Sequence, residues 1–128
     1  MSTRSFICIE DDEQGYRGIY CHFDGYPEHV GKILVEYYNH IAAAEMIVHG
    51  PQIRNFDNDG RVVRFGDGTP DDSEVYLGIE EALSSGFDYA YVYSTQENCW
   101  LCFSKPRSTI NGYLKEHAIP GNTPWEDA

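Results

Sequence analysis

Thiol, imidazole and carboxylate side chains lie close together in residues 18–40, GIYCHFDGYPEHVGKILVEYYNH. With the Cys-x-x-Cys of Cys99 and Cys102, such groups could complete a tetrahedral zinc shell. The spacing argues against this site, because CWLCF is apolar and predicts a strand, in which residues three apart face opposite sides. A redox role fails similarly, since this pair does not open a helix. We therefore expect no metal and no cofactor. The cysteines predicted as buried thiols are Cys8, Cys21, Cys99 and Cys102.

A cysteine nucleophile is the second chemistry that this segment could support. Cys21 and His22 are neighbours on a predicted strand and point apart, so a base would have to come from the following helix, as His29 or His40. The sequence contains no Gly-x-Ser-x-Gly, His-Glu-x-x-His or phosphate-cradling glycine loop. It therefore favours a protein that is not an enzyme, with no catalytic residue and a structural strand–turn–helix corner. The candidate ligand corner consists of His22, Asp24, Tyr26 and His29.

Calcium binding is the third candidate, in NFDNDGRVVRFG. Asn55, Asp57, Asp59 and Gly60 match the first, third, fifth and sixth positions of an EF-hand loop. The twelfth position, where a bidentate glutamate closes the shell, is Gly66. The sequence therefore predicts an Asp-Gly turn in place of a calcium site.

The charge balance is the strongest feature of the composition. The chain has 21 acidic and 9 basic residues among 128, which gives a net charge of −12. Such a surface repels phosphate, so we expect no direct binding of nucleic acid or of an anionic membrane, and attraction to a basic protein surface. Simple solubility is the other explanation of the charge. The predicted partner-binding residues are Glu10, Asp11, Asp12, Glu13, Asp57, Asp59, Asp67, Asp71, Asp72 and Glu74.

Aromatic residues form a second pattern that could mark an interface. Tyr89, Tyr91 and Tyr93 share one face of the predicted strand FDYAYVYS with Phe87. The stripe indicates either a core or homodimer contact, or an exposed partner-binding face. Trp125 in the tail is either a docking anchor or a loose end. No secretory signal and no apolar run of about 20 residues is visible, so we expect a cytoplasmic protein.

The hydrophobic patterns predict an α+β fold. The runs 5–10 and 16–23 predict a hairpin, with Ile7 opposite Cys21, and the runs 87–94 and 99–104 predict a second. A short strand is expected at 61–65. Helices are expected after Pro27, over 41–49, over 78–86 and over 107–117. The first helix should bury Val30, Ile33, Leu34, Tyr37, Tyr38 and Ile41. We therefore predict one domain over 1–119, an antiparallel sheet with two to four helices on one side, and an acidic tail over 120–128.

The N-terminal third carries a specific pattern of residues. It has Ser-Thr-Arg-Ser at the start, a strand, then Ile-Tyr-Cys-His-Phe-Asp-Gly-Tyr-Pro leading to Val-Gly and an apolar helix. This pattern resembles small uncharacterised proteins encoded by bacteriophages and prophages. The resemblance covers roughly 40 of the 128 residues and implies a phage accessory protein, with no activity and no residue role attached.

Charge and resemblance together lead to one functional hypothesis and two alternatives. The first is a protein that binds a basic host protein or nucleoprotein complex and so blocks a host nucleic-acid-handling defence machine. It would act as an anti-CRISPR or nuclease inhibitor, with carboxylates in the place of phosphates. The second is a nucleotide-signal sponge or Cys/His hydrolase at the Cys21–His29 corner, with Arg4, Arg17 and Lys32 as local bases. The third is a virion or replication component that acts through self-assembly.

Overall fold

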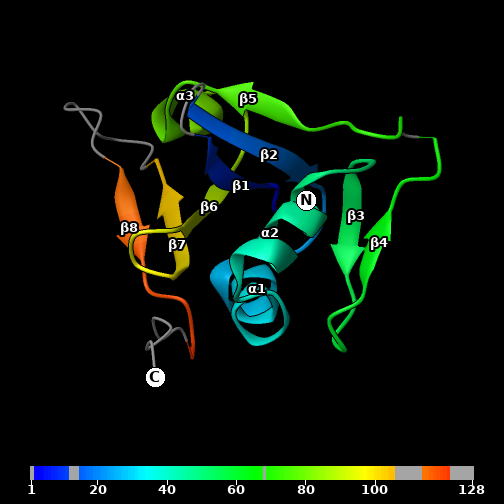
Figure 1. Cartoon of the computed structure of the whole chain (residues 1–128), viewed down its shortest axis with the longest axis horizontal. Helices are drawn as coiled ribbons and strands as arrows, with labels where there is room; N and C mark the ends of the chain where they lie inside the picture. Colours follow the sequence, from blue (N-terminus) through cyan, green and yellow to red (C-terminus); the bar gives the residue numbers. More distant parts are fainter. Residues whose placement is uncertain (1, 12–14, 68, 106–113, 122–128) are drawn as a thin grey trace.

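The computed structural model describes residues 2–11, 15–67, 69–105 and 114–121, and these form an α+β fold with one central sheet (Figure 1). The strands are β1 Ser5–Asp11, β2 Gly15–Cys21, β3 Ile53–Phe56, β4 Val62–Arg64, β5 Glu74–Tyr76, β6 Tyr89–Ser94, β7 Cys99–Ser104 and β8 Lys115–His117. The helices are a π-helical turn η1 Pro27–Gly31, α1 Lys32–Tyr37, α2 Ile41–Val48 and α3 Ile79–Ser84. The strand order is β4-β3-β2-β1-β6-β7-β8, and β5 pairs with β2.

The sheet is mixed, which corrects the expectation of an antiparallel one. The predicted β1–β2 and β6–β7 hairpins are confirmed, but β1 runs parallel to β6 and β2 runs parallel to β3. The connections explain this, because η1, α1 and α2 lie between β2 and β3 and α3 lies between β5 and β6. A helical crossover allows the chain to re-enter the sheet in the same direction.

The β1–β2 register differs by two residues from the predicted one. Ile7 lies opposite Ile19, and Ser5 lies opposite Cys21. The hairpin closes at Gly15, whose φ of 102° is readily adopted only by glycine. Because side chains alternate with a period of two, this shift leaves the paired residues of both strands on their expected faces.

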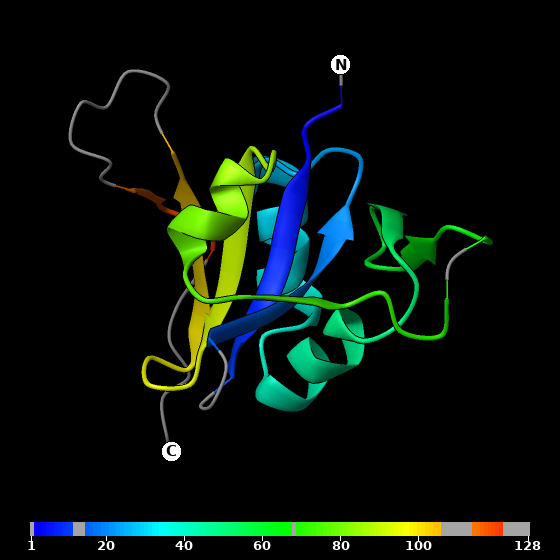
Figure 2. The same ribbon diagram turned by 90° about the horizontal axis from the view of Figure 1, so that it is seen from above.

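The sheet is covered on both faces, whereas we predicted helices on one side. The α1–α2 face is packed by η1, α1 and α2, and the opposite α3 face is packed by α3 (Figure 2). The core of the α1–α2 face contains Ile7, Ile9, Ile19, Cys21, Val30, Ile33, Leu34, Ala44, Ile47, Val48, Ile53, Phe56, Tyr91, Tyr93, Trp100, Cys102 and Ile119. The core of the α3 face contains Phe6, Cys8, Ile79, Ala82, Leu83, Ala90 and Val92. Strands β1 and β6 are apolar on both sides, so each face needs a cover.

The first helix buries less than predicted. Val30, Ile33 and Leu34 are buried, but Tyr37 is 46% exposed. Tyr37 is exposed because α1 ends at this residue. Its ring lies over Gly60 in the β3–β4 turn and does not enter the core.

The C-terminal region departs from the prediction of a helix over 107–117. Lys115–His117 is strand β8, which pairs with β7, and residues 106–113 lie outside the described part. Residues 122–128 of the predicted tail, with Trp125, also lie outside it.

Within the described ranges, no helix has the length and apolar character needed to span a bilayer.

Candidate functional site

The predicted corner at residues 18–40 is held from inside the core. Asp24 adopts a φ of 56°, and the next residue, Gly25, donates its N–H to the Thr3 carbonyl at 2.9 Å. A Cβ at Gly25 would lie 2.8 Å from the Cβ of Ser5, so only glycine fits. The buried Tyr91 hydroxyl donates to the Gly25 carbonyl at 2.7 Å. The corner is therefore held by hydrogen bonds within the fold. One of them comes from Tyr91, a member of the predicted aromatic stripe.

The four candidate ligands of this corner do not meet at one point, although the ring centroids of Tyr26 and His29 lie 6.3 Å apart. His22 contacts Tyr20 through its Nδ1, on the strand side opposite Cys21. His29 instead uses its Nε2 to contact the Phe56 carbonyl at 2.9 Å. The other two candidates, Asp24 and Tyr26, are both exposed. The imidazoles thus lie among different neighbours, and no common ligand position results.

The cysteines are core residues, as the sequence predicted. All four are buried, and none of them forms a disulfide. Cys102 lies in the core of the α1–α2 face, and strand alternation places Cys99 on the other side of β7. Burial raises the pKa of Cys21 to about 12, which keeps the thiol protonated at neutral pH. Among the described residues, no cluster of three metal-ligating side chains occurs.

The Asp-Gly segment forms a turn, as predicted. Asp57 donates its N–H to the Arg61 carbonyl at 2.8 Å, and Gly60 donates to the Asp57 carbonyl at 2.9 Å. The Asp59 carboxylate accepts the Arg61 N–H at 3.2 Å, and the Asn55 amide donates to the Asp57 carboxylate at 3.3 Å. These contacts close the β3–β4 hairpin.

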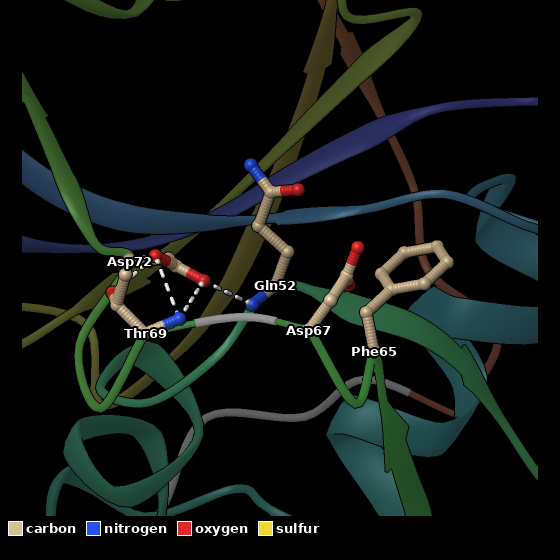
Figure 3. A pocket seen from close by; sticks show the side chains of 5 residues that line it. All are labelled: Gln52, Phe65, Asp67, Thr69 and Asp72. Carbon is tan, nitrogen blue, oxygen red and sulfur yellow. Dashed lines mark hydrogen bonds between the residues drawn. The ribbon is translucent and has the colours of Figure 1, made fainter.

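Asp72 holds the loop that follows this hairpin. Its carboxylate accepts the backbone N–H of Gln52 at 3.1 Å and that of Thr69 at 3.2 Å, together with the Thr69 hydroxyl (Figure 3). The Thr69 hydroxyl is the main cause that lowers the pKa of Asp72, and the backbone amides add to it. The Asp67 side chain points away from these contacts and is exposed.

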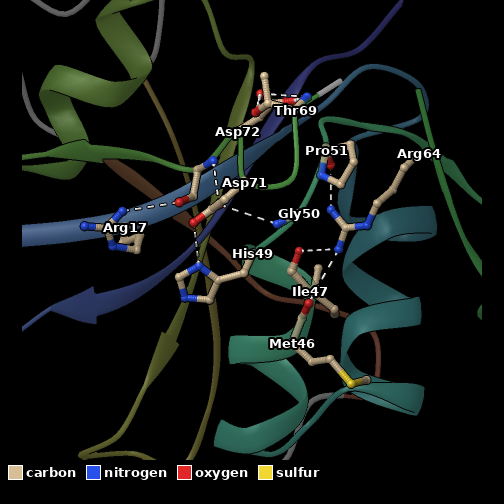
Figure 4. Close-up of polar contacts among 11 residues, drawn as sticks. Arg17, Met46, Ile47, His49, Gly50, Pro51, Arg64, Thr69, Asp71 and Asp72 are labelled. Carbon is tan, nitrogen blue, oxygen red and sulfur yellow. Dashed lines mark hydrogen bonds and ion pairs between the residues drawn. The ribbon is translucent and has the colours of Figure 1, made fainter. Parts of the chain in front are cut away.

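Asp71 ties the same loop to the end of α2. Its carboxylate contacts His49 Nδ1 at 3.2 Å and accepts the Ser73 N–H at 3.0 Å (Figure 4). Hydrogen bonds from Ser73, with contributions from His49 and Gly50, hold the pKa of Asp71 well below its usual range. Two of the predicted partner-binding acids therefore act within the fold.

Arg64 provides a second anchor in this region. Its guanidinium donates to the carbonyls of Ile47 at 2.7 Å and Pro51 at 2.6 Å (Figure 4). The contacts cap the carboxyl end of α2, where cations are favourable. Half-burial lowers the pKa of Arg64 without removing its charge.

The predicted acidic residues do not form one surface. Glu10 pairs with Tyr16 near the start of β2, whereas Asp59 lies at the tip of the β3–β4 hairpin, which extends from the other end of β2. Glu74 lies on β5, opposite Gly18. Asp12 and Glu13 lie outside the described residues, as does the side chain of Asp11.

The α3 face carries an acidic surface that we did not predict as a unit. Strand alternation places Glu10 on this face with Phe6, and Glu116 lies opposite Phe103 in the β7–β8 pair. The exposed carboxylates of this face are Glu10, Glu74, Glu80, Glu81 and Glu116. Alternation along β1 signals the first of them, but Glu116 was assigned to a helix, which hid its position.

An apolar groove of about 400 Å³ lies on this face, with the carboxylates Glu10 and Glu80 in its lining. Its lining consists of Glu10, Tyr16, Leu77, Gly78, Ile79, Glu80, Val92, Leu101, Phe103 and Leu114. Leu77, which is 80% exposed, extends the apolar surface of the groove at its edge. The groove and its acidic border are the strongest candidate for a binding surface.

A smaller pocket of about 260 Å³ lies at the other end of this face. It is lined by Arg4, Tyr20, Gln52, Glu74, Tyr76, Ser85, Gly86 and Phe87. Three aromatic rings and one guanidinium meet there, while Arg17 is engaged elsewhere with Ser73 and Lys32 lies exposed on α1.

No protein-family model matches this sequence, and neither a curated protein nor a solved structure matches the chain. The resemblance to phage-encoded proteins therefore stays a prediction. The function proposed below is based on the charges and the apolar groove of the α3 face.

Proposed function

We propose that the protein is a non-catalytic binding protein whose acidic α3 face docks on a basic surface of another protein. The observation that carries this proposal is the set of exposed carboxylates which four elements, β1, β5, α3 and β8, bring to the same face. Complementary charge of this kind accelerates association and selects basic partners. The buried thiols and separated imidazoles supply no competing reactive centre within the described residues.

The resemblance of the N-terminal third suggests the setting in which such binding acts. In this proposal a phage accessory protein works in the cytoplasm of the host cell and blocks a nucleic-acid-handling defence machine, such as a CRISPR complex or a nuclease. The carboxylates take the places of phosphates on its lysines and arginines. The net charge of −12 supports steering toward such a target.

Capture from a bacterial lysate followed by a competition assay tests the proposal. The immobilised protein should retain a basic protein that duplex DNA displaces and that salt of about 0.5 M releases. A variant with Glu74→Gln, Glu80→Gln, Glu81→Gln and Glu116→Gln should lose this protein. A matched variant with Glu28→Gln, Glu36→Gln, Glu45→Gln and Glu97→Gln, four exposed acids outside the acidic set of the α3 face, should retain it. Equal retention by both variants would contradict the proposal.

A second candidate function is the binding of a small aromatic anion such as a mononucleotide. The pocket that contains Arg4, Tyr20 and Phe87 supports it, because a base can stack on the rings while the guanidinium meets a phosphate. Glu74 in the same lining opposes an anion. Titration calorimetry with AMP should show binding that Arg4→Ala removes; no heat at millimolar AMP would exclude this function.

A further inference from the structure

The groove on the α3 face has a shape that suits side chains inserted from a partner. Leu77 and Ile79 form one wall at the start of α3, and Leu101, Phe103 and Leu114 of the β7–β8 region form the other. The three latter side chains are partly exposed. A volume of about 400 Å³ lies at the lower end of the usual range of ligand pockets, roughly 300–1,000 Å³, which fits a few apolar side chains.

Carboxylates from three elements border this apolar surface. Glu10 and Glu80 belong to its lining, and Glu116 stands next to Phe103 across the β7–β8 pair. Within the described part of the chain, none of these three carboxylates forms a hydrogen bond or ion pair. Among the described residues, the lining contains no lysine or arginine, and Lys105 after β7 donates to the Ser84 hydroxyl of α3 at 3.1 Å. An occupant must therefore bring apolar side chains at its centre and positive charges at its edges.

This charge pattern selects among the occupants of an apolar groove. A second copy would bring another chain of net charge −12 and the same glutamates to the contact, which like-charge repulsion opposes. An anionic membrane meets the same objection. A basic amphipathic segment satisfies both requirements, because a helix presents apolar anchors at i, i+3, i+4 and i+7 with charged residues beside them.

We propose that the groove between α3 and the β7–β8 strands binds a short basic amphipathic helix of a partner protein. Its apolar side chains pack against Leu77, Leu101 and Phe103, and its lysines or arginines face Glu10, Glu80 and Glu116. This inference rests on the proposed function, for which it names the kind of partner and the contact.

Fluorescence anisotropy with a synthetic peptide tests the groove directly. The probe is a labelled peptide of about 15 residues with leucine at helical spacing and lysine elsewhere. One control peptide has the same residues in an order without an apolar stripe, and another has glutamate in place of lysine. The probe should bind, both controls should bind at least tenfold more weakly, and added salt of about 0.5 M should weaken the probe. Equal binding of probe and reordered control would overturn the proposal.

Matched variants locate the contact. Leu77→Ser should weaken the probe about tenfold, because it removes a large exposed apolar side chain from the contact. Met46→Ser, which changes a 69% exposed side chain on α2, should have no effect. Glu80→Gln should weaken binding several-fold, and Glu45→Gln on α2 should not. Both leucine and methionine sites are exposed, so circular dichroism and urea midpoints should match the parent chain.

The two proposals can fail separately. If the lysate partner is lost with the four-glutamate variant but retained by Leu77→Ser, the groove proposal is wrong and the proposed function stands. If the probe depends on Leu77 but no basic protein is captured, the groove proposal stands and the proposed function is wrong.

Discussion

Asp71 and Asp72 in the loop after β4 accept hydrogen bonds from the backbone and side chains around them, whereas Glu10, Glu80 and Glu116 on the α3 face lie exposed. The carboxylates are chemically alike in the two regions. They differ in what the fold places beside them, which is a set of free backbone amides in the loop and an apolar groove on the α3 face. Acids of the first kind hold the structure, and acids of the second kind are available to a partner.

The largest expected effect in the loop region comes from its cation. Arg64→Ala leaves the carbonyls of Ile47 and Pro51 without their donor and should lower the free energy of unfolding by about 2–3 kcal/mol. Urea denaturation measures this change. The free energy of unfolding of Arg64→Lys should lie between those of the parent chain and Arg64→Ala, because an ammonium group cannot donate to both carbonyls in the fork geometry of a guanidinium. Arg61→Ala, at an exposed residue of the β3–β4 turn, is the control and should cost under about 0.5 kcal/mol. Similar losses for Arg64→Ala and Arg61→Ala would show that the α2 anchor contributes little.

The second largest effect tests whether the corner at residues 18–40 contributes to stability, as the loop after β4 does. Tyr91→Phe removes the hydroxyl that donates to the Gly25 carbonyl inside the core and should cost about 1–2 kcal/mol in urea denaturation. Tyr37→Phe is the control, because that ring is 46% exposed and should tolerate the change. A Tyr91→Phe chain as stable as the parent would mean that the corner does not depend on this contact.

Acid pH should weaken the loop region in a way that depends on Asp71. Its pKa is lower in the folded chain than the value of about 3.9 in an unfolded one, so the unfolded state binds more protons in this range. The contribution of Asp71 to stability is therefore present above pH of about 4 and is lost as the pH falls through the folded pKa. Asp71→Asn should flatten the dependence of the urea midpoint on pH between about 2 and 5. Parallel curves for the two proteins over this range would contradict the role of Asp71.

The sequence was informative wherever neighbouring residues decide the structure. Alternation identified both hairpins and placed Ile7 and Ile19 on the correct face, and CWLCF identified a strand that separates Cys99 from Cys102. The parallel pairing of β1 with β6 was not predictable in this way. It joins segments about 84 residues apart, and local patterns do not specify which distant strands pair.

The candidate site shows the same limit. Asp71 and Asp72 were grouped with the surface acids because they are close in sequence, but Gln52, some 20 residues away, supplies one of the amides that engage Asp72. Glu116 joined the acidic face only because β8 is a strand opposite Phe103. Composition gives the number of carboxylates, and tertiary contacts decide which of them face a partner.

The smallest effect on stability is expected for the acids of the α3 face, in contrast to Asp71 and Asp72 of the loop. Glu80→Gln and Glu116→Gln should each change the free energy of unfolding by less than about 0.5 kcal/mol, since both side chains are exposed. Removing one of several like charges on this face should, if anything, stabilise the chain slightly at low ionic strength. Urea denaturation at two salt concentrations measures this, with Asp71→Asn as the contrasting loop variant. A loss above about 1 kcal/mol for either glutamate variant would place these carboxylates with the structural acids, because side chains free for a partner leave the folded state unchanged when they are neutralised.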